Sequence, residues 1–259
     1  MKRRRKVWIG ILIFVGIVAV ALLVNFIPTF SLKTKGMHEI QGEWINVYYE
    51  QEEAAAQDVF AYADSQTAEI AEILGFQEKQ NVNIYIYDHQ STMQTKKYGY
   101  LAYLLGLDWY IGDNIGTDVL LTSPANPGKV HDYDEVKYAV LHEIVHAYVS
   151  VLNEDIDLWL TEGVALYLSN GEPFYHEYIE TMGIPSYRDT CSNNPLTFSD
   201  CGGYTFAHTY IAYLTQTYGW DRVLMLLKTE DYKQCFGKSG QQIYNDWVTY
   251  LTNETYPSI

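Results

Sequence analysis

The segment AVLHEIVHAYV carries two histidines at a spacing that suits a metal ion. His142 and His146 lie four residues apart, so on a helix they project from the same face, one turn apart. Two imidazole nitrogens arranged in this way can bind one ion at about 2.0 to 2.1 Å, the distance typical of zinc. Glu143 is rotated by about 100° from His142, so its carboxylate can reach a water on the metal instead of the metal itself. The pattern predicts a zinc site with a general base beside it.

A second glutamate further along the chain completes the predicted ligand set. Glu162 lies in DLWLTEGVALYLSN, sixteen positions after His146. Two helices joined by a short turn near residues 153–157 can pack antiparallel, which would return this carboxylate to the histidine pair. Two histidines and one glutamate leave one tetrahedral position open, as in catalytic zinc sites. We therefore expect His142, His146 and Glu162 to bind one Zn²⁺.

HEIVH followed by WLTEGVA resembles the gluzincin metallopeptidases, and the compact peptidase-MA-like proteins are the nearest group. The order of segments from about residue 43 to 251 is also similar to theirs. The resemblance implies zinc-dependent hydrolysis of a peptide or protein substrate, with Glu143 as the catalytic base. It also implies that Tyr204, at the start of YTFAHTYIAYLTQTYG, donates a hydrogen bond to the oxyanion, with His208 as the alternative donor.

Residue patterns predict the elements that would position this site. Strands are expected first and helices later, an order that favours an α+β fold with a small mixed sheet and a helical half. The resemblance to gluzincins implies that this domain is zincin-like. Within 112–124 we expect turn, strand and turn, and residues 115–122 would form the edge strand along which an extended peptide adds. The other expected elements are strands at 42–51 and 82–88, and helices at 52–75, 134–153, 157–169, 204–218, 221–228 and 241–251.

The N-terminus has the layout of a membrane anchor. Five cations occupy residues 2–6, and an uncharged apolar run of 21 residues follows at 7–27, where about 20 are needed to cross a bilayer as a helix. Basic residues before the helix favour a cytoplasmic N-terminus. A cleaved signal peptide is the competing interpretation, although its apolar core is usually only about 7 to 15 residues long.

These observations predict four consecutive regions in a single-pass protein of the cell membrane. They are a cytoplasmic basic tail (1–6), a transmembrane helix (7–27), a linker (28–42) and an extracellular peptidase domain (43–259). Beyond residue 6 the chain holds 12 cations and 32 anions, which excludes nucleic acid as a partner. Of the three cysteines, Cys191 and Cys201 could form a loop disulfide, or all three could be free thiols.

Two other classes of protein are compatible with the same sequence. A non-catalytic extracellular binding module could retain the zincin scaffold, and even its metal, without turnover. An acidic structural ectodomain would hold no zinc. Replacement of Glu143 by Gln separates the first alternative from a peptidase, because it should preserve metal binding and abolish hydrolysis.

Overall fold

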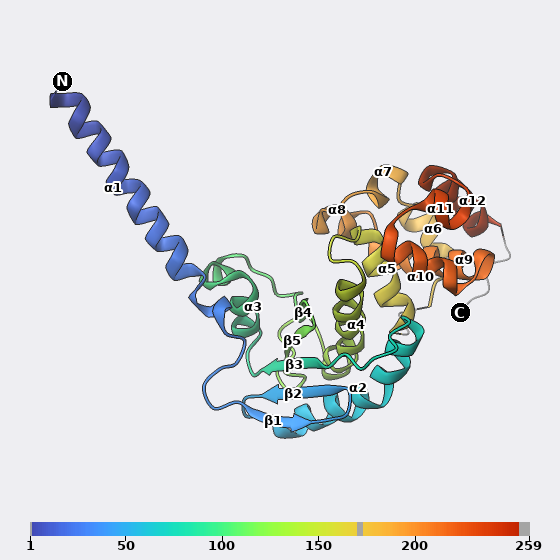
Figure 1. Cartoon of the computed structure of the whole chain (residues 1–259), viewed down its shortest axis with the longest axis horizontal. Coiled ribbons are helices and arrows are strands. Elements are labelled where there is room, and N and C mark those ends of the chain that lie inside the picture. The colour runs from blue at the N-terminus through green and yellow to red at the C-terminus, as the bar shows by residue number, and fades with distance from the viewer. Residues whose placement is uncertain (1, 170–172, 254–259) are drawn as a thin grey trace.

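The computed structural model describes residues 2–169 and 173–253. The beginning of the expected basic tail (residue 1) and parts of the expected peptidase domain (170–172 and 254–259) lie outside the described residues. A long N-terminal helix precedes a domain with a five-stranded mixed sheet and a helical half (Figure 1). The expected α+β class is confirmed.

The apolar run forms helix α1 (Lys2–Asn25), which is followed by the 3-10 turn η1 (Ile27–Phe30). Among the described residues, the part of α1 from Lys6 to Asn25 is long and apolar enough to cross a membrane, as an anchor or a signal sequence would. The helix ends two residues before the expected boundary at residue 27. Pro28 explains this end, because it lacks the N–H that would continue the hydrogen-bonding pattern of the helix.

The five strands form one sheet in the order β1-β2-β3-β5-β4. The central pairs, β2 with β3 and β3 with β5, are parallel, and both outer pairs are antiparallel. The two edges of the sheet are therefore β1 and β4. The strands are β1 (His38–Gln41), β2 (Ile45–Tyr49), β3 (Val82–Tyr87), β4 (Gly112–Ile115) and β5 (Asp118–Thr122).

Two features of the sheet differ from expectation. Residues 38–41 form strand β1 within the segment that was expected to be linker, because they pair with β2. The prediction of an edge strand at 115–122 is wrong. A turn at Gly116, whose φ is +58°, divides this region into a hairpin in which β5 lies between β3 and β4, so the edge is residues 112–115.

Helices cover both faces of the sheet and form the second half of the domain. α2 and α4 pack on one face and α3 on the other. Side chains of β3 alternate between the two faces of the sheet. Ile84 and Ile86 belong to the main core, whereas Tyr85 and Tyr87 belong to a smaller cluster with Met93. The helices are α2 (Glu53–Ile73), α3 (Gln90–Tyr98), the 3-10 turn η2 (Tyr100–Leu104), α4 (Tyr133–Leu152), α5 (Leu158–Leu168), α6 (Glu177–Met182), α7 (Tyr187–Thr190), α8 (Pro195–Asp200), α9 (Gly203–Tyr218), α10 (Trp220–Thr229), α11 (Tyr232–Phe236) and α12 (Gly240–Thr252).

The three cysteines lie in this helical half and all are free thiols. Cys191 is exposed, Cys201 is partly buried and Cys235 is fully buried. The alternative of a Cys191–Cys201 disulfide is therefore not realised in the structure.

Candidate metal centre

Helix α4 positions the two histidines. Its N-terminus is fixed by a capping box, in which the Asp132 carboxylate accepts a hydrogen bond from the Glu135 N–H and the Glu135 carboxylate accepts one from the Asp132 N–H. Asp134 is a further acidic residue in the first turn of α4, where it favours the helix N-terminus. The apolar stripe of α4 is buried in the core, so His142 and His146 lie on the adjoining, partly exposed face. Their Nε2 atoms are 2.9 Å apart.

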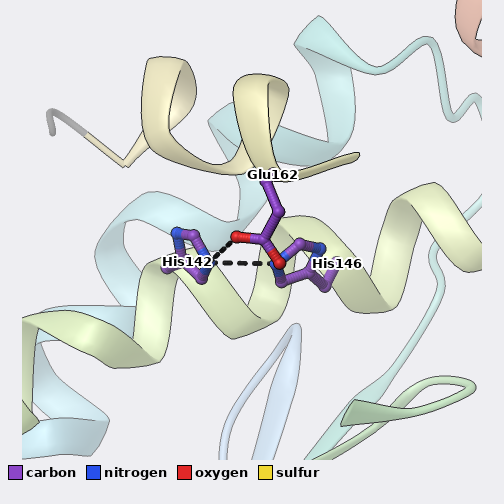
Figure 2. Close-up of side chains that lie close together, drawn as sticks. All are labelled: His142, His146 and Glu162. Atoms are coloured by element: carbon purple, nitrogen blue, oxygen red, sulfur yellow. Dashed lines mark hydrogen bonds and ion pairs between the residues drawn. The ribbon is translucent and has the colours of Figure 1, made fainter. Parts of the chain in front are cut away.

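Helix α5 brings Glu162 against this pair. α5 packs between α4 and α9, and Gly163 permits the close approach to α9, because a Cβ at this position would lie 2.8 Å from the carbonyl oxygen of Ala207. Glu162 Oε2 lies 3.3 Å from His142 Nε2, and Glu162 Oε1 lies 3.5 Å from His146 Nε2. Figure 2 shows the glutamate extending from α5 to the histidines of α4. The expected return of this carboxylate to the histidine pair is thus present.

The chemistry of these three side chains fits a divalent metal ion. One candidate ligand atom from each of His142, His146 and Glu162 lies within 4.8 Å of the others. Glu162 Oε2 is buried without a hydrogen-bond partner, which is costly for a carboxylate oxygen unless a cation neutralises it. Burial raises the pKa of Glu162, but the two imidazoles outweigh burial and hold it below its ordinary value. A set of two imidazoles and one carboxylate is one that zinc prefers.

Thr161 supports the site in a way that the sequence analysis missed. Its Oγ1 lies 2.9 Å from Nδ1 of His146. When the Nδ1–H of His146 donates to this hydroxyl, Nε2 carries the lone pair and faces the other two ligands. The sequence offered one hint, namely that Thr161 directly precedes Glu162 on α5, but its reach to α4 depends on how the two helices pack.

Glu143 is buried beside the ligand set. The pKa of Glu143 is raised to about 8: burial is the main cause, His142 opposes it, and the neighbouring carboxylates of Asp113 and Glu162 add to the rise. The residue faces edge strand β4, since a Cβ on Gly112 would lie 2.9 Å from Glu143 Oε1. Glu143 therefore lies between the predicted metal ligands and a sheet edge, where a carboxylate with a raised pKa can exchange protons near neutral pH.

Strand β4 offers only part of its outer edge for pairing. Thr122 N–H donates to the Ile111 carbonyl, so residue 111 bonds to the neighbouring strand. Along an antiparallel strand every second residue does so, and the N–H and carbonyl groups of Gly112 and Asn114 therefore point away from β5. Those of Asn114 are already engaged, because its N–H donates to the Asp113 carboxylate and its carbonyl accepts from Lys97 Nζ at 2.7 Å. Gly112, next to Glu143, is thus the position of β4 at which an added peptide could pair without displacing a side chain.

Lys97 also forms an ion pair with Asp113 at 2.9 Å. Asp113 accepts a hydrogen bond from the Tyr110 hydroxyl. Burial raises the pKa of Asp113, whereas Lys97 lowers it. Neither Lys97 nor Asp113 belongs to a sequence motif, and their ion pair forms only because α3 packs beside β4. The sequence analysis therefore did not predict either residue as part of the site.

Tyr204 and His208 lie one turn apart on α9 and share a pocket. The pocket has a volume of 320 Å³ and is lined by Leu166, Pro173, Tyr178, Tyr204, Thr205 and His208. Burial raises the pKa of Tyr204, and the carboxylates of Glu162 and Glu143 raise it further, so this phenol faces the electrostatic field of the site. Burial lowers the pKa of His208 to about 4, so its imidazole is neutral at pH 7. Neither residue belongs to the three-residue ligand set.

The structure thus unites His142, His146 and Glu162 into a set able to hold a metal ion, with Glu143 next to His142 on α4. Tyr204 on α9 is close enough for the carboxylates of Glu162 and Glu143 to raise its pKa. No family model and no curated protein matches this chain. What is shown is a metal-binding arrangement of two histidines and one glutamate in an α+β domain that follows an apolar N-terminal helix.

Proposed function

We propose that this protein is a membrane-anchored zinc peptidase of gluzincin type. The observation that carries the proposal is the convergence of His142, His146 and Glu162, together with a buried Glu143 that faces the sheet edge. The resemblance of HEIVH and WLTEGVA to gluzincins supports it. A zinc ion bound by the three ligands would supply Lewis acidity and an activated water for hydrolysis.

The roles of the remaining residues follow from their places around the ligand set. Glu143 takes a proton from the attacking water and delivers it to the leaving amine of the cleaved peptide bond. Tyr204 donates a hydrogen bond to the oxyanion, since its phenol is protonated at neutral pH. The backbone of Gly112 pairs with the substrate main chain on the open part of the β4 edge.

The contacts of the end of α1 and of the segment after it support an uncleaved anchor over a signal peptide. Asn25 is buried against the domain, where its Oδ1 accepts a 2.7 Å hydrogen bond from the Leu101 N–H. The carbonyls of Ser31 and Leu32 accept hydrogen bonds from Lys96 and Tyr87. Cleavage after the apolar run would remove Asn25 from the folded structure. We therefore propose that the N-terminus is cytoplasmic and the domain extracellular.

Metal analysis combined with two substitutions tests this function. The full chain, purified in detergent, is expected to hold one zinc per molecule and to hydrolyse members of a broad peptide library. Glu162→Ala should lower the zinc content because it removes the third ligand. Glu143→Gln should keep zinc at one per chain and reduce kcat/KM by at least about 100-fold, since it removes the base.

Each contrary result has a definite meaning. Unchanged zinc in Glu162→Ala would remove this residue from the ligand set. A wild-type chain with zinc but without hydrolysis across the library would favour the binding module, and a chain without zinc would favour the structural ectodomain. Circular dichroism of both variants establishes that the fold is retained.

A further inference from the structure

A cluster of large apolar side chains is exposed where the domain meets α1. We call it the juxtamembrane patch: Tyr100, Leu101, Tyr103, Leu104, Leu105 and Trp109. Leu104 is 80% exposed and Tyr103 60%, and η2 buries only Ala102 among its five residues. Contiguous apolar surface of this kind marks a contact with a membrane or a partner.

The patch is fixed to the end of the apolar helix. Asn25, the last residue of α1, accepts a hydrogen bond from the Leu101 N–H and donates one to the Tyr98 carbonyl at 3.4 Å. The contact is close enough that a Cβ on Gly99, whose φ is +75°, would overlap the Asn25 carbonyl. Figure 1 shows α1 leaving the domain at this corner, beside α3. If α1 spans a bilayer, the patch must therefore lie at the membrane surface.

The composition of the surrounding surface suits lipid. The turn η1, which packs on α3, exposes Ile27 and Phe30, and Phe26 between α1 and η1 is exposed as well. Between Tyr98 and Trp109 the one acidic residue is Asp108, whose carboxylate is paired with Lys129 Nζ at 2.9 Å. Tyrosine, tryptophan and leucine on an otherwise neutral surface are typical of segments that insert into the boundary between headgroups and acyl chains.

We propose that the juxtamembrane patch rests on the outer surface of the bilayer, so that the domain is held against the membrane at two places, α1 and η2. This inference rests on the proposed role of α1 as an uncleaved anchor, and it does not depend on zinc or on hydrolysis. A second copy of the chain or another protein would be the alternative occupant of the patch. Lipid is favoured because the hydrogen bonds of Asn25 fix the patch at the exit of the helix.

Spin-label accessibility in vesicles tests the proposal. A nitroxide is attached at Leu104→Cys in the full chain, in a background with Cys191→Ser and Cys201→Ser, while the buried Cys235 is kept. The chain is reconstituted into phosphatidylcholine vesicles. The matched control is Leu196→Cys on α8, another exposed leucine at 68%, which lies in the helical half.

The label at 104 is expected to collide severalfold less often with a water-soluble nickel reagent than the label at 196, and severalfold more often with oxygen, which concentrates in lipid. Equal collision with the nickel reagent at both positions would overturn the proposal. A label at 104 that is shielded from both reagents would also overturn it, because protein would then cover the patch. A chain that does not stay with the vesicles would contradict the anchor as well, whereas loss of zinc or of hydrolysis would leave these readouts unchanged.

Discussion

At the scale of single residues, the ligand set depends on a side chain that binds no metal. Thr161 Oγ1 lies 2.9 Å from His146 Nδ1, and when it accepts the Nδ1–H it leaves the lone pair of the imidazole on Nε2, where a metal would bind. Thr161→Val keeps the shape of the side chain and removes the hydroxyl, so we expect zinc affinity to fall by about 10- to 100-fold. Competition for zinc with a chromogenic chelator measures this affinity. Thr161→Ser keeps the hydroxyl and should stay close to wild type; equal loss in both variants would show that packing alone is responsible.

The burial of His208 predicts how the free energy of unfolding depends on pH. Burial lowers its pKa to about 4 from an ordinary value near 6.5, so between these pH values the unfolded chain binds the proton and the folded chain does not. The stability that this neutral histidine contributes is therefore fully present above pH 6.5 and is lost as the pH falls towards 4. His208→Gln should flatten this part of the pH profile, by an amount on the order of 1 to 3 kcal/mol between pH 7 and pH 4.

Urea unfolding of the full chain in detergent at several pH values measures this difference. His176 is exposed and also lies in the helical half, so His176→Gln is the matched control and should leave the profile unchanged. Parallel profiles for wild type and His208→Gln would contradict the prediction. If His208 instead of Tyr204 is the oxyanion donor, the same variant lowers kcat at pH 7, which Tyr204→Phe would then not do.

At the scale of elements, the position of α5 between α4 and α9 sets the place of Glu162. Gly163→Ala would put a Cβ 2.8 Å from the Ala207 carbonyl oxygen, a backbone atom that cannot turn away, so the two helices must separate. We expect a loss of about 1 to 3 kcal/mol in the free energy of unfolding, together with weaker zinc binding. Gly240→Ala on α12 is the control, because its nearest neighbour is the Tyr187 hydroxyl at 3.1 Å, the end of a flexible side chain. Unchanged zinc affinity in Gly163→Ala would show that the position of Glu162 does not depend on the packing of α5 against α9.

The sequence predicted those elements whose pattern is local. The histidine helix and the glutamate helix have apolar stripes and clear ends, so both were located within about one residue of α4 and α5. The ligand set itself followed from spacing on those two helices. Local pattern could not supply β1, a short and mostly exposed strand that exists because β2 offers it a pairing partner.

The misplaced edge strand has a related cause. Alternation of residue types marks a strand but does not say which neighbours it pairs with, so the internal β5 was taken for an edge. The ion pair of Lys97 with Asp113, and the contact of Thr161 with His146, join residues from elements whose packing no motif encodes. These side chains became visible only with the tertiary structure.

At the scale of the whole molecule, Asn25 couples the apolar helix α1 to the domain. Its side chain accepts a hydrogen bond from the Leu101 N–H at 2.7 Å, so this amide directly reports the coupling. Asn25→Ala removes both hydrogen bonds of the side chain, and each contributes about 0.5 to 1.5 kcal/mol net. We expect the Leu101 amide to exchange with solvent faster, with little change in the unfolding of the sheet and the helical half.

Hydrogen–deuterium exchange of the full chain in vesicles, followed in peptides that cover residues 99–105, measures this effect. Thr29→Ala is the control, since the Thr29 hydroxyl donates only to the nearby Phe26 carbonyl within η1. Equal exchange in wild type and Asn25→Ala would mean that other contacts hold the helix to the domain. Faster exchange confined to this segment would show that a single buried amide side chain couples α1 to the domain.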